Sequence, residues 1–296
     1  MSYKKSYLKK HRTKKKHVLS KSLLILAIPF ALMAGAERYL PQEWPVHIWI
    51  RHIFQEITSL TREHDPMPLR SVRGELTVDF LDVGQGSCAL ITLDEHAMLY
   101  DCGPDDKGTY IEYYLQKQGI RRLDYVIGSH PDADHIGGMD VVLTKFECDT
   151  VLMPGLERDT AAYRDVKEVL RYRGYRSIQP SAGTVYDFGD AQFVVLGPIQ
   201  LYPEEPNNNS IVIRLKYGAN TFLFTGDAQT DEERDILESG EYLRSQVYLA
   251  GHHGSRNASS PEFLAAVQPE YAVISCDPQN DYGHPHEETL ERLQSV

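Results

Sequence analysis

The sequence predicts an α/β domain over residues 75–296 from three observations. Short apolar runs alternate there with segments whose apolar residues recur at helical spacing. Strand hairpins come first and strands separated by helices come later, which is typical of mixed sheets flanked by helices. The stretch of roughly 220 residues is also long enough to bury one substantial core. We therefore expect a single α/β domain.

The expected strands are the short runs rich in apolar, β-branched and aromatic residues. They cover residues 76–81, 88–93, 98–100, 125–127, 150–153, 192–196, 210–215, 221–224, 247–250 and 271–275. The expected helices carry their apolar residues on one face. They cover residues 109–118, 136–143, 161–172, 230–237, 261–267 and 286–293. The sequence has no apparent internal repeat.

The N-terminal residues differ in charge from the rest of the chain. Residues 1–21 hold nine Lys and Arg and no Asp or Glu, which leaves 22 basic against 42 acidic residues, or −20, for the remainder. Residues 22–36 are uncharged and mostly apolar. A basic flank before such a run is typical of a secretory signal or a membrane anchor, with the basic side in the cytoplasm. We therefore expect a cytoplasmic tail at 1–21 and export of the domain that follows.

Two forms of export remain open. The apolar segment is short for a membrane span, although the amine of Lys21 could snorkel. Ala34-Gly35-Ala36 also fits a cleavage site of small residues. The protein is then either single-pass with its domain outside the cell, or secreted after cleavage near Ala36. A buried core helix is the third alternative, and it gives the basic tail no role. Residues 37–74, with prolines near their start, are expected to be a linker.

Metal-binding side chains are densest in one six-residue motif, His130-Pro131-Asp132-Ala133-Asp134-His135. The motif follows an apolar run and precedes small residues, so a strand end and a tight loop would direct all four polar side chains into one volume. Crowded carboxylates and imidazoles repel one another and lose hydration unless a cation lies among them. Imidazole and carboxylate are common metal ligands. The motif therefore predicts a metal site.

Three further segments bring His or Asp to the ends of expected strands. Asp227 ends the run Thr221-Phe-Leu-Phe-Thr-Gly-Asp, His252 and His253 follow the next strand, and His284 follows the last one. Each alone is a weak signal. In layered α/β folds, however, functional residues gather at strand ends on one edge. We therefore expect these segments to converge with residues 130–135.

Together these motifs resemble the metallo-β-lactamase-fold superfamily, and more narrowly the extracellular hydrolase domain of ComEC-type competence proteins. The resemblance covers roughly residues 75–295 and rests on motifs in a fixed order. They are His-x-Asp-x-Asp-His-x-Gly-Gly, Thr-Gly-Asp, His-His-Gly-Ser and Gly-His-Pro, with Leu81-Asp-Val-Gly-Gln-Gly86, Tyr100-Asp-Cys-Gly103, Asn207-Asn-Asn-Ser-Ile-Val212 and Leu223-Phe-Thr-Gly-Asp227. The family implies an αββα sandwich with a two-metal site on one edge.

The resemblance also implies ligand roles. His130 and Asp132 would bind one ion, Asp134 and His135 the second, and Asp227 would bridge the two. Either His252 or His253 would complete the second site. His284 would be a further ligand or would contact the leaving phosphate. Asp82 and Asp101 would orient ligands.

Three departures from the family pattern bear on these roles. Asp132 stands where the commonest motif has histidine, which shifts the preference from zinc toward manganese or magnesium without excluding zinc. Residues 207–209, all asparagine, occupy the position where many relatives supply another histidine. Ser87 stands where ComEC-type sequences usually have aspartate, which puts any ligand-orienting role there in doubt.

The resemblance implies phosphodiester hydrolysis. Two divalent cations would neutralise charge on a phosphoryl displacement and activate water near neutral pH. Asp134 or Asp227 would position the nucleophile, and His253 or His284 would stabilise or protonate the leaving oxygen. The expected enzyme is a DNase linked to DNA uptake or breakdown. The Asp132 and His-His-Gly-Ser elements argue against a β-lactamase.

The acidic balance leaves other substrates and roles open. A charge of −20 has the wrong sign for a long phosphate tract. A basic patch around Arg171, Arg173 and Arg176 could compensate, or could be only a solvated helix face. The alternatives are a phosphodiesterase for a nucleotide or a phosphocholine-decorated envelope polymer, and a catalytically silent DNA-uptake module.

The four cysteines have no metal-type spacing. Three of them lie in or beside apolar strand runs, where a free thiol behaves as a small hydrophobic group. An exported protein could oxidise a pair. The sequence does not identify such a pair.

Overall fold

The computed structural model describes residues 65, 67, 70 and 72–296. The expected tail, the apolar segment 22–36 and most of the linker 37–74 lie outside these residues. Within the described part of the chain, no helix is both long enough and apolar enough to cross a membrane.

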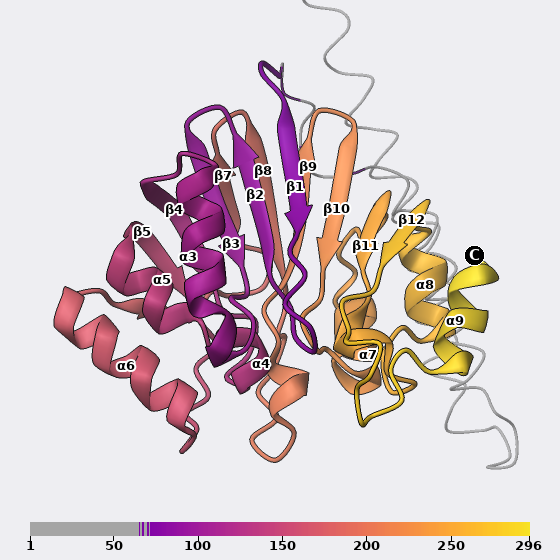
Figure 1. Ribbon diagram of the computed structural model, residues 1–296. Coiled ribbons are helices and arrows are strands. Elements are labelled where there is room, and N and C mark those ends of the chain that lie inside the picture. The colour runs from indigo at the N-terminus through magenta and orange to yellow at the C-terminus, as the bar shows by residue number, and fades with distance from the viewer. Residues whose placement is uncertain (1–64, 66, 68–69, 71) are drawn as a thin grey trace, which may run out of the picture. The chain divides into compact units, whose positions relative to one another are not determined.

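The first half of the domain forms a six-stranded sheet whose strands follow their order in the sequence (Figure 1). Its strands are β1 (Leu76–Phe80), β2 (Ala89–Leu93), β3 (His96–Tyr100), β4 (Arg122–Ile127), β5 (Glu147–Leu152) and β6 (Ser177–Ile178). β1 to β3 pair antiparallel, and β3 to β6 pair parallel. The parallel part is connected through helices, as parallel strands require.

The second half forms another six-stranded sheet, in the order β12-β11-β10-β9-β8-β7. Its strands are β7 (Val185–Phe188), β8 (Ala191–Gly197), β9 (Val212–Tyr217), β10 (Asn220–Phe224), β11 (Val247–Leu249) and β12 (Tyr271–Val273). β7 to β10 pair antiparallel, and β10 to β12 pair parallel. Each half therefore begins with hairpins and ends with parallel strands.

Helices cover the outer face of each sheet (Figure 1). They are η1 (Asp105–Lys107), α3 (Gly108–Lys117), α4 (Ala133–Ile136), α5 (Met139–Lys145), α6 (Ala161–Arg173), η2 (Pro206–Asn209), α7 (Thr230–Ser239), η3 (Gly251–Gly254), α8 (Pro261–Val267) and α9 (Glu287–Gln294). α3 to α6 flank the first sheet, and α7 to α9 flank the second. The layers are helix, sheet, sheet and helix.

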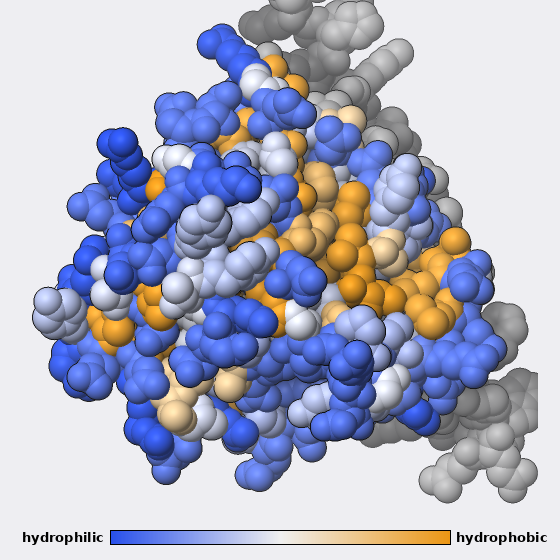
Figure 2. Space-filling view, viewed as in Figure 1, coloured by the Kyte–Doolittle hydropathy of each residue, from blue (hydrophilic) through white to orange (hydrophobic). Residues whose placement is uncertain are grey.

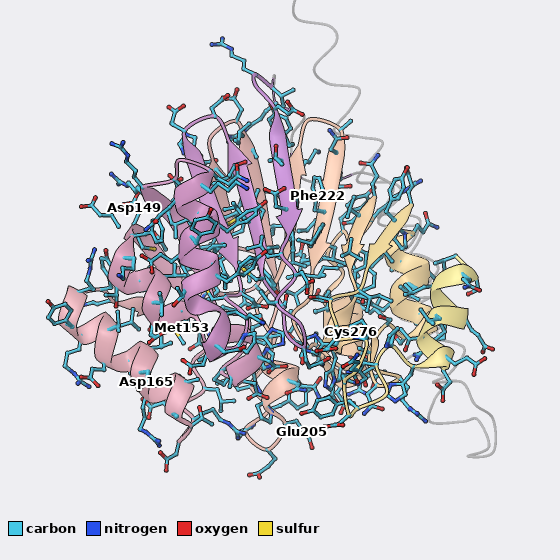
Figure 3. The ribbon with its side chains drawn as sticks, viewed as in Figure 1. Asp149, Met153, Asp165, Glu205, Phe222 and Cys276 are labelled. Carbon is cyan, nitrogen blue, oxygen red and sulfur yellow. The ribbon has the colours of Figure 1, made fainter. Side chains whose placement is uncertain are left out.

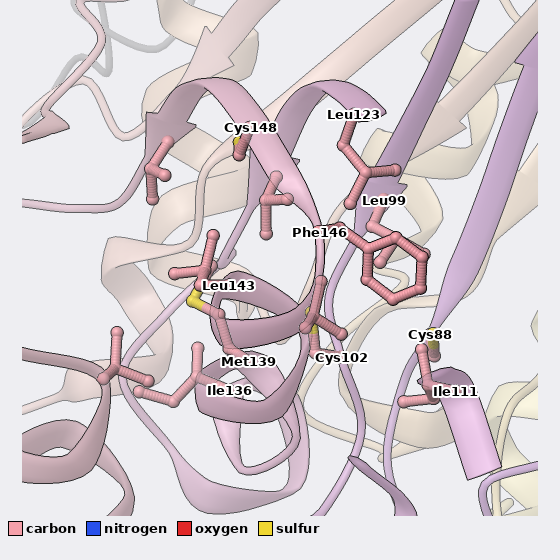
Figure 4. Close-up of a cluster of buried hydrophobic side chains, with 14 of the residues drawn as sticks. Cys88, Leu99, Cys102, Ile111, Leu123, Ile136, Met139, Leu143, Phe146 and Cys148 are labelled. Carbon is pink, nitrogen blue, oxygen red and sulfur yellow. The ribbon is translucent and has the colours of Figure 1, made fainter. Parts of the chain in front are cut away.

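Three apolar clusters hold these layers together. Alternate side chains of a strand point to opposite faces, so Leu90 packs under the helices of the first half while Ile91 packs between the sheets. Figure 4 shows the outer cluster, in which Leu99 and Met139 lie among buried thiols. Full burial of one such side chain stabilises the fold by about 1.5–3 kcal/mol. The cluster between the two sheets, which includes Ile91 and Phe224 and is called the inner cluster below, fixes the sheets against each other.

Part of the inner cluster reaches the surface. Figure 2 shows apolar side chains gathered along the seam in front of β1 and the last strands of the second sheet. The partly buried members of the inner cluster include Leu76, Val78, Phe80, Phe222 and Val273. The labelled Phe222 lies beside this seam (Figure 3). These strands therefore present part of their apolar surface on the face shown in Figure 2.

All ten expected strands are present, with ends shifted by up to a few residues. Two strands, β6 and β7, were not expected, because one is two residues long and the other carries polar side chains. The expected helix at 136–143 is wrong as one element, since α4 ends at Ile136 and α5 begins at Met139. The break is packed tightly: a Cβ on Gly137 would lie 2.3 Å from the Asp105 amide nitrogen. Cys88, Cys102, Cys148 and Cys276 are all free thiols.

A carboxylate within the expected linker pairs with two buried cations of β9. Asp65 accepts hydrogen bonds from Arg214 at 3.2 and 3.0 Å, and its Oδ2 lies 2.8 Å from Lys216 Nζ. Only 2% of the Arg214 side chain and 7% of the Lys216 side chain are exposed. Lys216 also donates to the Met67 carbonyl. Asp65 is thus the counter-ion that makes burial of both cations tolerable.

We predict that Asp65→Asn destabilises the protein by about 3 kcal/mol, because it leaves two buried cations without their carboxylate. Urea unfolding of the full chain measures the loss. Asp106→Asn is the matched control. Its carboxylate is 74% exposed and 3.6 Å from Lys107 Nζ, and such exposed pairs contribute less than about 1 kcal/mol. Equal effects of the two substitutions would contradict the role assigned to Asp65.

The contact of Asp65 with Arg214 and Lys216 also predicts that the stability of the protein depends on pH. Burial alone would raise the pKa of Asp65, but Lys216 and Arg214 lower it below the usual 3.8. A carboxyl whose pKa is lower in the folded state stabilises the fold above its unfolded pKa, and this contribution is lost as the pH falls through the folded value. The stability difference between wild type and Asp65→Asn should therefore be constant near neutrality and shrink below pH 3.8. Unfolding measured across acid pH checks this trend.

Candidate metal centre

The candidate site lies where strands of both sheets end at one edge. The loop after β4 carries residues 128–135, the loop after β10 carries Asp227, and η3 after β11 carries His252 and His253. Met153, which follows β5, and Cys276, which follows β12, mark the two sides of this edge (Figure 3). Because parallel strands bring their carboxyl ends to the same edge, segments meet there that lie far apart in the sequence, such as His135 and His253, which are 118 residues apart.

Asp101, just beyond β3, anchors the first two histidines. Its Oδ2 lies 2.8 Å from His135 Nδ1 and accepts the Ser129 hydroxyl at 3.0 Å. Ser129 Oγ in turn lies 3.1 Å from His130 Nδ1. A carboxylate only accepts hydrogen bonds, so His135 carries its proton on Nδ1. With its proton given to Asp101, the Ser129 hydroxyl accepts from His130 Nδ1. Both imidazoles therefore turn their Nε2 atoms toward the second sheet.

His253 is oriented in the same way from the other half of the domain. Its Nδ1 lies 2.8 Å from the Ser275 carbonyl oxygen, which can only accept. Its Nε2 therefore faces His135 Nε2, at 3.1 Å. Two such nitrogen lone pairs repel each other at this distance unless a proton or a metal ion lies between them. The two halves of the chain thus meet at a pair of ligand atoms.

Asp227 is the carboxylate shared by these imidazoles. Its Oδ1 lies 3.1 Å from His135 Nε2, and its Oδ2 lies 3.8 Å from His130 Nε2 and 3.6 Å from His253 Nε2. Only 5% of its side chain is exposed. Gly226 lets the loop approach this closely, because a Cβ at its φ of +52° would lie 2.6 Å from Ser129 Cβ. The chain therefore places Asp227 at the centre of the cluster.

The donor atoms fit divalent metal ions. Two sets have their ligand atoms within 4.8 Å of one another: His130, His135 and Asp227, and Asp134, His135 and His253. His130 Nε2 and Asp227 Oδ1 are buried without a conventional hydrogen-bond partner, and such atoms are costly to bury unless something else compensates them. Imidazole and carboxylate are the ligands that zinc and manganese accept. The two sets have His135 in common, so the cluster offers ligand atoms for two neighbouring ions.

The remaining predicted ligands lie around this core. Asp134 Oδ2 is 3.2 Å from His253 Nε2, and Asp132 Oδ2 is 3.8 Å from His130 Nε2. His252 Nε2 is 3.7 Å from Asp227 Oδ2. His284 is more distant, with its ring centre 5.5 Å from that of His252. All eight residues predicted as ligands are thus brought together, with His284 at the periphery.

Electrostatics keep most of these groups in their ligand forms at neutral pH. Burial lowers the pKa of His130 to about 3. Burial alone would raise the pKa of Asp134, but His135 and His253 lower it to about 2. Burial opposes protonation of His135 as well, yet Asp227 and Asp101 raise its pKa well above 6.5. The carboxylates around His135 therefore favour a positive charge at this position. Either a proton or a divalent cation can supply that charge.

The backbone at the site adopts conformations that are uncommon for residues with a side chain. Asp101 has φ of 62°, His252 of 49° and His253 of 55°. Each such residue costs on the order of 1 kcal/mol and persists only where the surroundings enforce it. These three positions set the directions of a ligand-orienting carboxylate and of two candidate ligands.

Several side chains beside the site differ from the expectation. Asp82 is exposed and accepts the Gly84 amide at 3.2 Å, so the expectation that it orients a ligand is wrong, whereas Asp101 does contact His135. Asn207 is the one asparagine of its run that reaches a candidate ligand, with Nδ2 3.3 Å from His252 Nε2. Ser129 was not predicted. Its only signal is a small polar residue between the β4 strand and His130.

Ser87 contributes through its backbone. Its amide donates to the Asp134 carbonyl at 3.1 Å, which holds the start of α4 against the loop after β1. Its hydroxyl is buried without a hydrogen-bond partner. The residue at this position therefore helps to place α4, and the structure shows no contact of its side chain with a ligand.

The fold is an αββα sandwich, and the site at its edge is a candidate metal centre. The family model described as "Metallo-beta-lactamase superfamily" matches residues 81–277, and the chain belongs to this superfamily. Among solved structures, a CmlA beta-hydroxylase mutant is similar with a TM-score of 0.50 and 13% identity, over 76% of this chain and 50% of that one. That likeness concerns the fold alone.

Curated relatives include competence proteins. The chain is 29% identical to "ComE operon protein 3" of Bacillus subtilis over 77% of its own length and 31% of the relative. It is 31% identical to "Competence protein ComA" of Neisseria gonorrhoeae over 92% of its own length and 36% of the relative. The chain thus spans about a third of the length of the curated relatives that it matches.

We predict that Asp101→Asn weakens binding of Mn²⁺ or Zn²⁺ by about 10–100-fold, because loss of a carboxylate that orients a metal-binding histidine has effects of this size. Isothermal titration of the full chain measures the affinity. Asp82→Asn is the control, since this exposed carboxylate bonds only its own loop. An unchanged affinity in Asp101→Asn, or an equal loss in both variants, would refute the orienting role.

Proposed function

We propose that the protein is an exported, metal-dependent phosphodiesterase that cleaves DNA and takes part in DNA uptake or breakdown. The observation that carries the proposal is the pair of overlapping donor sets around His135 and Asp227 at one edge of the sandwich. Two-metal sites of carboxylate and imidazole suit displacement at phosphorus. Similarity to competence proteins supports DNA as the substrate.

Bound divalent ions would supply charge neutralisation for the phosphoryl oxygens and a lowered pKa for water. The ligands for one ion would be His130, Asp132 and Asp227, and for the other Asp134, His135 and His253. His252, 3.7 Å from Asp227 Oδ2, would be the additional ligand. The Asp132 oxygen makes Mn²⁺ or Mg²⁺ as acceptable as Zn²⁺.

The residues themselves would divide three tasks. Asp134 and Asp227 have pKa values below the usual range even though burial opposes this, so they are ionised and can orient an attacking water. Burial and the neighbouring histidines lower the pKa of His284 to about 4. His284 is therefore a neutral imidazole near pH 7, placed to donate a hydrogen bond to the leaving oxygen rather than to protonate it. Asp101 holds His135 in the required tautomer.

Export is part of the proposal and rests on the basic tail 1–21 and the apolar segment 22–36. A single-pass protein would hold the catalytic domain on the outer side of the membrane. Cleavage near Ala36 would release it instead. Either form would place the metal centre outside the cytoplasm, where DNA from the surroundings first reaches the protein.

Two alternatives follow from the same site. The acidic balance of the chain, −11 overall, favours a short phosphodiester over a long nucleic acid, so a nucleotide or an envelope phosphodiester is the second candidate substrate. A silent uptake module is the third. The buried atoms without partners argue for the enzyme, because a site that had lost its metal would have no reason to retain them.

We predict that the full chain hydrolyses bis-p-nitrophenyl phosphate with Mn²⁺, and that Asp134→Ala or Asp227→Ala lowers the rate by about 100-fold or more, as expected for removal of a group that stabilises the transition state. Both variants should also lose bound metal, measured by elemental analysis. Asp82→Ala should retain wild-type activity. The proposal fails if no turnover occurs with Mn²⁺, Zn²⁺ or Mg²⁺, or if a chromogenic β-lactam is hydrolysed instead.

A further inference from the structure

An open groove of about 580 Å³ lies along α6 and the loop before it. Its lining residues are Glu157, Arg158, Asp159, Tyr163, Arg164, Lys167, Glu168 and Arg171. The helix is firmly bounded: the Thr160 hydroxyl accepts the Tyr163 amide at one end, and Gly174 closes the other with φ of 71°. One wall of the groove is therefore a capped helix, and residues 157–159 of the preceding loop complete the lining.

Four cations line this groove along one direction. Arg164, Lys167 and Arg171 lie three and four residues apart on α6, so they share one face of the helix. Arg158 extends the row into the loop. Only Arg164 is engaged in an ion pair, with Asp159. In the part of the chain that the structure describes, Arg158, Lys167 and Arg171 form no salt bridge.

The burial of these groups favours an anionic ligand. Arg158 and Lys167 are half-buried in the groove wall, whereas Glu157 and Glu168 are exposed to solvent. The Lys167 ammonium lies 5.9 Å from the centre of the Tyr163 ring. Half-buried cations that form no salt bridge are less well compensated than exposed carboxylates, which water solvates. The inner part of the groove is therefore the more electropositive one.

The groove leads to the metal centre. α6 packs against α4, the short helix that carries Asp134 and His135. Arg158 lies in the loop that follows β5, at the sheet edge where the loop after β4 carries the site. Figure 1 shows α4 and α6 on the same side of the first sheet, at its lower edge. A chain leaving the metal centre on this side would pass Arg158 first and Arg171 last.

We propose that the groove binds the backbone phosphates of single-stranded nucleic acid on one side of the bond that the metal centre cleaves. This rests on the proposed phosphodiesterase function and deepens it. From Arg164 to Arg171 the helix rises about 10 Å, which a small phosphodiester held at the metals does not span. A groove of this volume is in the range of small-ligand sites, so it would hold a short stretch of a single strand. In an acidic protein, such a local row of cations would supply the phosphate contacts.

The test compares a long and a short substrate on the full chain. In the double variant Arg158→Gln with Lys167→Gln, kcat/KM for a 12-nucleotide single strand should fall at least tenfold, while that for bis-p-nitrophenyl phosphate stays within twofold. The salt dependence of oligonucleotide binding should become shallower by about 1.4 in logarithmic slope for two lost contacts. Lys117→Gln, an exposed cation on α3, is the control and should change none of these values.

Other results separate this inference from the proposed function. If both substrates are affected equally, or neither is, the groove is not a phosphate site. If wild type does not cleave bis-p-nitrophenyl phosphate, the proposed function fails. The groove is then judged by fluorescence anisotropy of the labelled strand with metals chelated, and unchanged binding in the double variant would overturn it. A base-free poly(glycerol phosphate) that competes as well per phosphate as the oligonucleotide would assign the groove to an envelope polymer and overturn the nucleic-acid assignment.

Discussion

The buried carboxylate of Asp227 imposes the constraint around which the rest of this edge is arranged. With 5% of its side chain exposed, it must be compensated by groups that the fold brings to it, since an uncompensated buried charge is strongly unfavourable. His130 and His135 come from the first sheet, and His252 and His253 come from the second. His130, His135 and His253 are each held through Nδ1. The same imidazoles therefore compensate the charge of Asp227 and are oriented as candidate ligands.

That arrangement needs two sheets packed in a fixed relation. The inner cluster, which includes Ile91 and Phe224, holds them together away from the site. The left-handed backbone at His252 and His253 is held by the hydrogen bonds of the His252 amide to the Gly226 carbonyl and of His253 Nδ1 to the Ser275 carbonyl. Because a close-packed interior transmits small displacements, a cavity in the inner cluster would be felt as a change in the distance between His135 and His253. Stability and ligand geometry are thus coupled in this fold.

The sequence contained most of the fold and of the ligand set. Apolar runs located ten strands, and the clustering of His and Asp at strand ends indicated that residues 130, 227 and 253 would converge. It could not reveal β6, which is too short to show a period, or the break between α4 and α5, which depends on Asp105 approaching Gly137 in space. Asp82 and Asp101 look alike as residues after a strand. Only tertiary contacts distinguish the exposed carboxylate from the buried one that reaches His135.

The division of the domain into two consecutive halves has a consequence for its synthesis. Residues 76–178 contain every strand of the first sheet, and the second sheet begins at Val185. The first half emerges first and can complete its backbone pairing while its inner face and residues 130–135 are still uncovered. The newborn chain therefore passes through a stage in which an apolar surface and half of a metal-binding centre face the surroundings. Both are covered only when the last strands of the second sheet have been made.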